Sequence, residues 1–330
     1  MGRVRYYAMR TLQTIFMLWL AATLLFLLFR AMPGDFTDQM LFAGADPEVV
    51  EQFRDDWGLN DPLYVQYYRY ITNLAVGNAG MSLEYRTPVI DYIRMRLFNS
   101  LILIAPGITF AYILGSLYGL IAGMNRGSLI EKYGIVPIIF LGAFPSFVTA
   151  IFLIVIFASW LGWFPTGGII TADTRRLLAD APWWRRYLTG DFLWHAALPF
   201  TAVVCRYLFL PSLIMRTSVF EVSGQGFTFY NRITGLPKVK RFRHIAKHAS
   251  LPVITLYPVS MTRAIGGLVL IEIVFNWPGI GAALVDGVLA RDYPVVQFVF
   301  FLIAAFIIIA NFAVDIIYGI IDPRISVEGE

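Results

Sequence analysis

The densest group of basic side chains in the second half of this sequence lies in NRITGLPKVKRFRHIAKHASLP, residues 231–252, between two apolar blocks. Gly235 permits a sharp reversal, and Pro237 suits the first turn of a helix. Helical spacing from Pro237 onward separates a basic side from an apolar side. The basic side holds Lys240, Arg241, Arg243, His244, Lys247 and His248, and the apolar side holds Val239, Phe242, Ile245, Ala246 and Ala249. Such a surface attracts acidic protein groups or anionic lipid, which is electrostatic chemistry and not catalysis.

The preceding stretch FEVSGQGFTFYNR predicts a second short helix, so the whole segment reads as helix, glycine turn, helix. We expect the apolar side of 237–249 to pack on the protein's own membrane helices. A basic loop is also what the positive-inside rule produces without any docking function, in which case anionic lipid would be its only partner.

Four ionisable residues fall inside long apolar runs, where charges mark functional candidates: Arg206, Arg263, Glu272 and Asp315. The hypothesis is that Arg206, Arg263 and Glu272 line a translocation pathway, and that Arg263 contacts polar or anionic cargo. The alternatives are a buried carboxylate partner for Arg263 and a snorkelling side chain at Arg206. Glu272 equally suits a structural or gating role, and Asp315 a pairing with a neighbouring helix.

Signatures of catalysis are missing from the sequence. It contains no GxxxxGK[ST], HExxH or GxSxG string. The histidines, His195, His244 and His248, have no acidic companion at metal-ligand spacing. A membrane enzyme is therefore not favoured, and we expect no resident cofactor, no metal site and no nucleic-acid partner.

The composition of the chain indicates that these residues belong to a membrane protein. The chain has 330 residues, of which 58% are hydrophobic and 15% charged, and its mean hydropathy is +0.66. Apolar runs near the length of a bilayer crossing predict an all-α polytopic protein with six spans. The predicted spans are Thr11–Ala31, Leu97–Met124, Tyr133–Leu161, Ala196–Ser218, Leu251–Phe275 and Val295–Ile321.

The distribution of Lys and Arg predicts the orientation. Basic residues concentrate at the N-terminus, between spans two and three, and after span four, which places both termini in the cytoplasm. We expect one membrane domain over 1–330, with an extracytoplasmic cap at 32–96 that contains two short helices, and a cytoplasmic loop at 219–250. The tryptophans of the 162–195 loop suit an interfacial anchor, although the four arginines of this loop run against the predicted orientation.

The order of residues in the basic loop resembles the permease subunits of the oligopeptide/dipeptide branch of ABC importers. That branch carries an "EAA" motif in which a glycine is followed at a distance by Leu-Pro, here Gly235 and Leu251-Pro252. EVSGQGF, NRITGL and RHIAKHASLP follow the branch's pattern, while Gly226, Thr234 and Phe229-Tyr230-Asn231 depart from it. The resemblance extends to residues 30–35, 58–70, 81–89, 271–297 and 315–325, and so covers nearly the whole chain.

The resemblance implies the fold of a type I importer permease and a mechanism. The loop would dock on a cytoplasmic ATPase, and closure of the ATPase pair around ATP would tilt the permease core from inward-open to outward-open. The implied coupling residues are Arg232, Gly235, Leu236, Pro237, Lys238, Arg243, Leu251 and Pro252. The implied partners are a second permease subunit, two ATPase subunits that use ATP and Mg, and an extracytoplasmic binding protein, all at the cell membrane.

Cargo stays open between peptides, oligosaccharides and nickel chelates. A secondary transporter driven by an ion gradient is the main alternative class. Such transporters show internal repeats and acidic ion sites near the midplane, and neither is evident here.

Overall fold

The computed structural model describes residues 2–31, 46–56 and 58–321, and within these ranges every named element is a helix. The all-α prediction is confirmed for this part of the chain. The described residues form two compact units, Met1–Leu97 with Ala282–Glu330, and Phe98–Gly281. Residues 32–45, which belong to the predicted cap, lie outside the described residues.

Four helices are long and apolar enough to cross a membrane by length and composition: α1 (Gly2–Ala31), α5 (Val89–Met124), α9 (Gly190–Ser223) and α14 (Tyr293–Ile321). Two further segments pass the same test only as bent pairs, namely α6 with α7 and η1, and the two parts of α12. The predicted six spans are therefore reached when each bent pair counts as one span.

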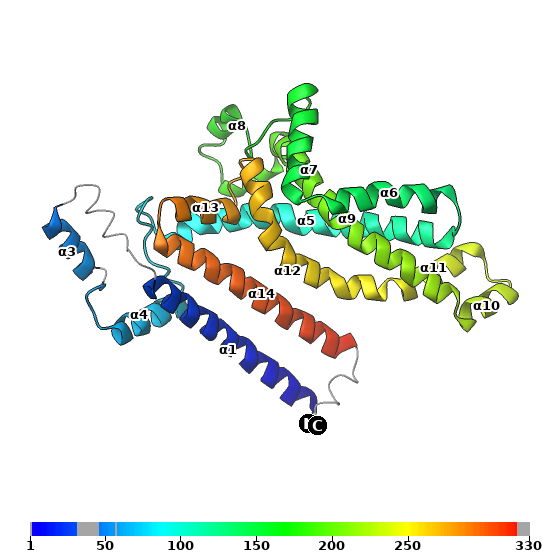
Figure 1. Ribbon diagram of the computed structural model, residues 1–330, viewed down its shortest axis with the longest axis horizontal. Coiled ribbons are helices and arrows are strands. Elements are labelled where there is room, and N and C mark those ends of the chain that lie inside the picture. Colours follow the sequence, from blue (N-terminus) through cyan, green and yellow to red (C-terminus); the bar gives the residue numbers. More distant parts are fainter. Residues whose placement is uncertain (1, 32–45, 57, 322–330) are drawn as a thin grey trace. The chain divides into compact units, whose positions relative to one another are not determined.

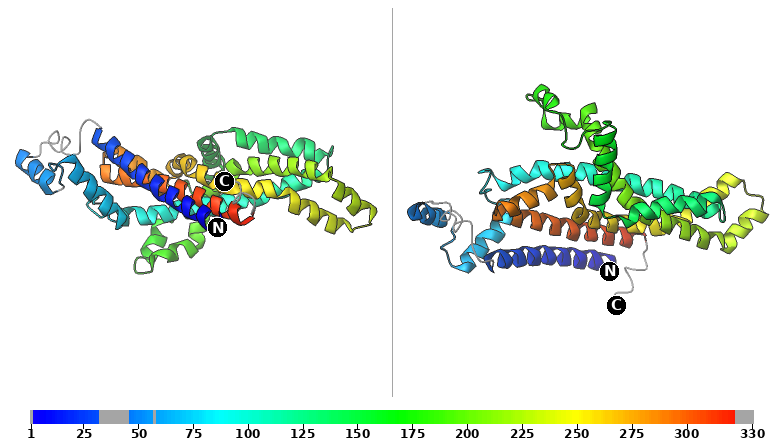
Figure 2. Two further views of the ribbon diagram at one scale, coloured as in Figure 1. Left: turned by 90° about the horizontal axis from the view of Figure 1, so that it is seen from below. Right: turned by 45° about the horizontal axis from the view of Figure 1, so that its top comes forward.

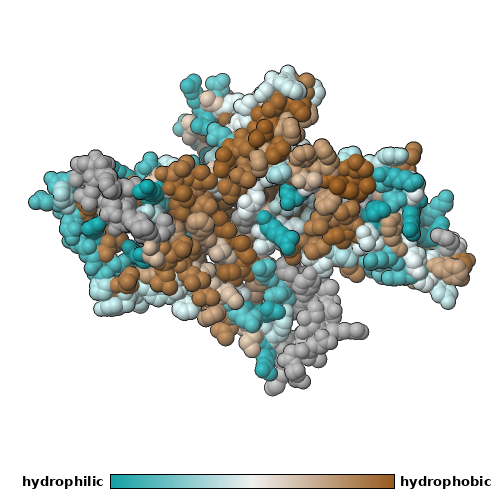
Figure 3. Space-filling model, in the orientation of Figure 1, coloured by the Kyte–Doolittle hydropathy of each residue, from teal (hydrophilic) through white to brown (hydrophobic). Residues whose placement is uncertain are grey.

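In the first unit, α1 packs along α14, and the two run side by side in every view (Figures 1 and 2). Arg10 Nη1 lies 3.3 Å from Asp315 Oδ2, and the Tyr6 hydroxyl donates to the Asp315 carbonyl oxygen at 3.4 Å. The prediction that Asp315 pairs with a neighbouring helix is therefore confirmed. Apolar side chains cover the visible face of this pair (Figure 3), as a lipid-facing surface requires; Leu12, Ile15, Leu24, Leu27 and Leu28 of α1 are all exposed.

Both helices expected in the cap are present, as α3 (Pro47–Asp56) and α4 (Leu63–Ala75). Tyr67 of α4 and Thr23 of α1 hydrogen-bond through their hydroxyls at 2.7 Å, and the ring of Phe26 packs against the rings of Tyr67 and Tyr70. These contacts tie α4 to the end of α1. A position on the membrane surface stays a prediction.

A buried carboxylate joins the segment before α5 to the start of α14. Asp292 is fully buried and accepts hydrogen bonds from Ser82 Oγ at 2.5 Å and from the backbone N–H of Glu84 at 3.2 Å. These bonds provide the partners that a buried charge requires. They fix the 82–84 turn, which lies next to an isolated bridge between Met81 and Pro88.

In the second unit, three glycines let α5 and α9 approach each other at backbone distance. A Cβ on Gly115 would lie 2.7 Å from the Leu208 carbonyl oxygen, and one on Gly123 would lie 2.7 Å from Val219 Cβ. One on Gly119 would overlap the Ser212 carbonyl oxygen. Glycines spaced by four residues lie on one side of a helix, and this pattern is common where membrane helices pack closely.

The third predicted span is broken. α6 (Leu129–Ala143) and α7 (Ser146–Leu153), the latter continued by the π-helix η1 (Ile154–Trp160), meet at an angle of 105°. Phe144 is extended because the residue before a proline is driven out of the helical region, and Pro145 then begins α7 as its N-cap. α12 (Leu251–Val274) bends less, by 56° between Ala264 and Gly266.

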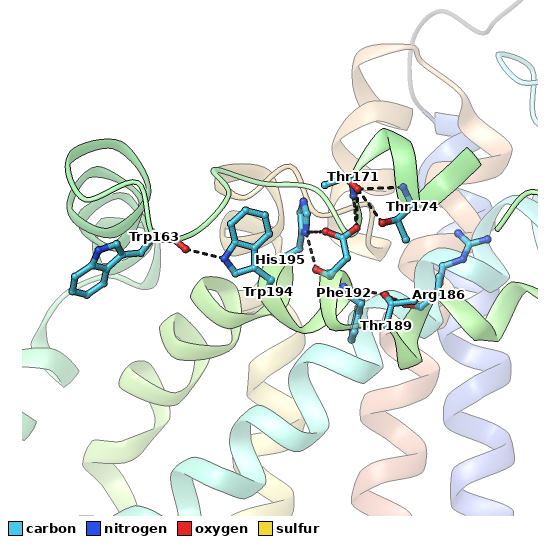
Figure 4. Close-up of polar contacts among 9 residues, drawn as sticks. Trp163, Thr171, Thr174, Arg186, Thr189, Phe192, Trp194 and His195 are labelled. Carbon is cyan, nitrogen blue, oxygen red and sulfur yellow. Dashed lines mark hydrogen bonds and ion pairs between the residues drawn. The ribbon is translucent and has the colours of Figure 1, made fainter. Parts of the chain in front are cut away.

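The 162–195 loop is held by hydrogen bonds around the start of α9 (Figure 4). Thr189 Oγ1 accepts from the Phe192 N–H at 3.1 Å and caps α9, while Trp194 Nε1 donates to the Trp163 carbonyl oxygen at 2.8 Å. Asp191 Oδ2 accepts from the Thr171 N–H at 2.7 Å, and Asp191 Oδ1 lies 3.2 Å from His195 Nδ1. His195 therefore has an acidic neighbour four residues earlier, contrary to the expectation from the sequence, and the pair is part of the packing of this loop. The loop also contains α8 (Ala172–Leu177) and η2 (Trp183–Leu188).

The tryptophans of this loop point outward. Trp163, Trp183, Trp184 and Trp194 are between 41% and 59% exposed. Exposed indole rings suit the interfacial position predicted from the sequence, which stays a prediction.

Candidate functional site

The basic segment folds as a helical hairpin. α10 (Gly226–Ile233) and α11 (Lys238–Ala249) pack together and flank the turn at 234–237 (Figure 1). Gly235 has a φ of +69°, a conformation that glycine adopts without steric cost, and the Leu236 N–H donates to the Asn231 carbonyl oxygen at 3.2 Å. The predicted sequence of helix, glycine turn and helix is confirmed.

The hairpin presents apolar side chains to its surroundings. Phe229, Tyr230 and Ile233 of α10 are 63%, 64% and 60% exposed. Large apolar side chains gathered on an otherwise basic loop suit a protein contact. Phe229 and Tyr230 stand at two of the five positions where the sequence departs from the "EAA" pattern.

The expected packing of α11 is wrong at its beginning. Val239 is 79% exposed and Phe242 is 38% exposed, whereas Ala249 is fully buried. α11 contacts α9 and α12, and the burial pattern shows that its C-terminal half makes most of this packing. The first turns of α11 extend beyond this packing with α9 and α12, so their apolar side stays exposed.

The structure gathers most of the predicted coupling residues on the hairpin. Gly235, Pro237, Lys238 and Arg243 are exposed there, and Leu236 is partly buried. Leu251 and Pro252 are exposed in the first turn of α12. The side chain of Arg232 lies outside the described residues.

Two of the three predicted pathway residues line one cavity. Arg206 of α9 and Arg263 of α12 lie on the wall of a cavity of about 270 Å³, together with Ser146, Tyr207 and Ser260. No carboxylate occurs among its lining residues, although the wall carries two guanidinium groups. Within the described part of the chain, the ion pairs likewise include neither Arg206 nor Arg263.

Glu272, the third predicted pathway residue, lies outside this cavity and is buried. Its side chain is fully buried and does not line the cavity. It accepts from Ser100 Oγ at 2.5 Å and from the Gly281 N–H at 2.8 Å, and Ser100 Oγ accepts in turn from the Ile280 N–H at 2.8 Å. A Cβ at Gly279 would overlap the carboxylate. This geometry supports the structural alternative for Glu272 rather than the pathway hypothesis.

An ion pair between Arg216 and Glu131 was not predicted from the sequence. Arg216 Nη2 lies 2.5 Å from Glu131 Oε1, and the Gly127 N–H donates to Glu131 Oε2 at 2.5 Å. The Arg216 guanidinium also lies over the Phe220 ring, 4.7 Å from its centroid. These contacts tie the turn between α5 and α6 to the end of α9, directly before the hairpin. The sequence signal was the S-x-x-E spacing of Ser128 and Glu131, which places this carboxylate at the start of α6.

Among the residues that the structure describes, no group of three or more His, Cys, Asp or Glu side chains is arranged to hold a metal ion. The arrangement offers a basic hairpin with an exposed apolar face and a cavity lined by two arginines. Both are means of binding.

Two family models together match most of the chain. Residues 115–327 match the binding-protein-dependent transport system inner membrane component, and residues 3–97 match the N-terminal region of the same component. The chain belongs to this family. It is a permease subunit of an ABC importer and not an enzyme. The helical hairpin and both cavity arginines lie within the larger match.

Three curated relatives match the sequence of the permease over nearly its whole length. It is 33% identical over 328 residues to the oligopeptide transport system permease protein AppB of Bacillus subtilis (strain 168), covering 97% of this chain and 99% of AppB. It is 33% identical over 325 residues to the glutathione transport system permease proteins GsiC of Shigella flexneri serotype 5b (strain 8401) and Escherichia coli (strain K12), covering 98% of this chain and 99% of each relative. The resemblance stated from the sequence is confirmed, as is a membrane protein with several apolar helices.

Proposed function

We propose that this permease forms half of the pathway of an ATP-driven importer that moves peptides delivered by an extracytoplasmic binding protein. The observation that carries the proposal is the α10–α11 hairpin with its exposed apolar face, within a chain that belongs to an importer permease family. A short rigid hairpin transmits a rigid-body shift between domains. The names of AppB and GsiC, an oligopeptide and a glutathione permease, support peptides as the cargo class.

The complex would contain a second permease subunit and two ATPase subunits that use ATP and Mg. The α10–α11 hairpin would face the cytoplasm, together with both termini, and would dock on one ATPase through the surface around Gly235. The excess of Lys and Arg on this loop supports that orientation at the inner, or plasma, membrane. The single membrane domain over 1–330, with its cap and coupling loop, belongs to the same proposal.

Two cargo alternatives, oligosaccharides and nickel chelates, use the same machinery. The cavity favours cargo that carries negative charge, since Arg206 and Arg263 line it without a carboxylate among their neighbours on the wall. A linear peptide with a free C-terminus carries a carboxylate that can pair with a guanidinium, whereas a neutral oligosaccharide offers only uncharged hydroxyl groups.

Affinity purification and reconstitution test the proposal. The tagged permease is expected to copurify with two ATPase chains and a second permease, and peptide uptake into liposomes is expected to require ATP and the binding protein. Uptake that continues without ATP but follows an ion gradient would instead establish the secondary-transporter alternative.

Replacing Arg263 with alanine is expected to lower peptide uptake because the cavity loses half of its positive charge. One charge-assisted hydrogen bond contributes about 1.5–3 kcal/mol, so uptake at limiting cargo is expected to fall by about tenfold or more. Arg263→Lys, which keeps the charge, is expected to retain part of the uptake. The measurement is uptake of labelled peptide against ATP hydrolysis in the same vesicles. Unchanged uptake with an unchanged cargo range would remove Arg263 from the pathway.

Replacing Gly235 with valine is expected to uncouple transport from ATP hydrolysis. A side chain at a φ of +69° costs about 1–2 kcal/mol, which leaves about five- to thirtyfold fewer hairpins in the docking conformation. The measurement is the number of peptides imported per ATP hydrolysed. Gly226→Ala in the same hairpin is the matched control, because its Cβ would meet nothing within 4 Å. An equal loss in both variants would contradict a specific role for the turn at Gly235.

A further inference from the structure

A second cavity lies between the hairpin and the ends of two candidate spans. Its volume is about 570 Å³, and its wall includes the last turn of α5, the last turn of α9, and residues of α10 and α11. This is within the volume range of sites that hold small molecules. It is separate from the arginine cavity, with which it shares no lining residue.

Three basic side chains line this cavity, and they come from different places in the chain. Arg126 follows α5, while Lys238 and Arg241 lie one turn apart on α11. No acidic residue occurs on the wall. The nearby Glu131 carboxylate is already engaged by Arg216 and by the Gly127 N–H. Three like charges around one space repel each other, so an anion in that space lowers their energy.

Arg241 also has a polar atom without a partner. Its Nε is buried, and within the described residues it makes no hydrogen bond. A buried donor left without an acceptor is costly, and phosphate oxygens accept from guanidinium groups in the paired geometry that Nε and one Nη provide.

The wall is amphipathic, as a lipid site requires. Met124, Phe220 and Ile245 line the cavity beside the three cations. α5 and α9 are candidate membrane spans, and both are longer than the roughly 20 residues of a bilayer crossing, so their last turns can extend to the headgroup level. Basic pockets between membrane helices bind anionic headgroups at this level.

We propose that this cavity binds a phosphate group, held by Arg126, Lys238 and Arg241 and carried by an anionic phospholipid headgroup. The bound lipid would connect the hairpin to the ends of α5 and α9. The site would therefore make the position of the hairpin sensitive to membrane composition. The proposal does not depend on ATP-driven transport, because binding is measured on the permease itself.

The experiment measures lipid retained by the purified full-length permease in native mass spectrometry. Protein taken from nanodiscs that contain phosphatidylglycerol and phosphatidylcholine is expected to retain phosphatidylglycerol. The double variant K238Q/R241Q is expected to bind it about 25-fold more weakly, at about fivefold for each lost cation. The matched control is K240Q/K247Q, which removes the same charge from the same helix at two positions that do not line the cavity; it is expected to retain the lipid.

A phosphate titration and the comparison of the variants distinguish the outcomes that would overturn the proposal. Inorganic phosphate, added to delipidated protein and followed by thermal midpoint, tests a soluble source; stabilisation without lipid retention would overturn the lipid assignment. Equal lipid retention by K238Q/R241Q and the wild type, or equal loss in K240Q/K247Q, would overturn the site. So would a K238Q/R241Q variant that keeps the lipid but no longer copurifies with the ATPase. If K238Q/R241Q does not give a monodisperse protein, R126Q carries the same test from a different element.

Discussion

Replacing Gly119 with valine is expected to prevent accumulation of folded permease. A Cβ at this position would overlap the Ser212 carbonyl oxygen and lie 2.8 Å from Met215 Cβ, so α5 and α9 would have to separate. Because the obstacle is backbone, no side-chain rearrangement relieves it. The expected loss of folding free energy is at least about 3 kcal/mol, at the upper end of overpacking penalties. The measurements are the yield of monodisperse protein and its thermal midpoint in detergent.

Gly190→Ala is the matched control for Gly119→Val. Gly190 is the first residue of α9, and a Cβ there would meet nothing within 4 Å. It is expected to leave yield and thermal midpoint near those of the wild type. A Gly119→Val protein with normal yield and midpoint would mean that the close approach of α5 and α9 does not exist in the membrane.

Replacing Glu272 with alanine is expected to have the second largest effect. The change leaves the Ser100 hydroxyl and the Gly281 N–H without their acceptor in a fully buried site. Two unsatisfied donors at about 1–3 kcal/mol each predict a loss of about 2–6 kcal/mol of folding free energy. Glu272→Gln, which keeps the shape and one acceptor oxygen, is expected to lose less. The measurement is again thermal midpoint and monodisperse yield.

Glu221→Ala provides the control for Glu272→Ala, because Glu221 is an acid with an exposed side chain on α9. It is expected to leave stability unchanged. If Glu272→Ala folds normally but imports poorly, the pathway hypothesis for Glu272 replaces the structural one.

Local patterns explain what the sequence predicted well. The helix, glycine turn and helix at 226–249 depend on spacing and on Gly235 and Pro237, which act within a few residues of themselves. The two short helices before α5 follow from the same kind of signal. The predicted pairing of Asp315 with a neighbouring helix also held, since a charge in an apolar run requires a partner.

The missed contacts join residues far apart in the chain. Glu131 and Arg216 are 85 residues apart, Ser100 and Glu272 are 172 apart, and Ser82 and Asp292 are 210 apart. A sequence shows that a buried acid needs a donor but not which distant donor it meets. The error at Val239 has a related cause, because periodicity defines the apolar side of a helix but not how far the covering helices extend.

Two local signals in the sequence indicate further features of the fold. The spacing of Gly115, Gly119 and Gly123 already indicates close packing of α5 against another helix. Pro145 lies inside the third predicted span, and the structure turns the chain by 105° at this point. A proline indicates that regular hydrogen bonding stops, while the surrounding packing determines the angle.

The contact between Ser100 and Glu272 also has a consequence for biosynthesis. As a membrane span, α12 would carry both Arg263 and Glu272 into the bilayer, and a charged side chain costs about 2.5–3.5 kcal/mol at the centre of an inserting helix. Ser100 is synthesised long before Glu272, so the donor on α5 is already in the bilayer when α12 leaves the translocon. From this order of synthesis we expect Ser100 to assist the insertion of α12, in addition to holding Glu272 in the folded protein.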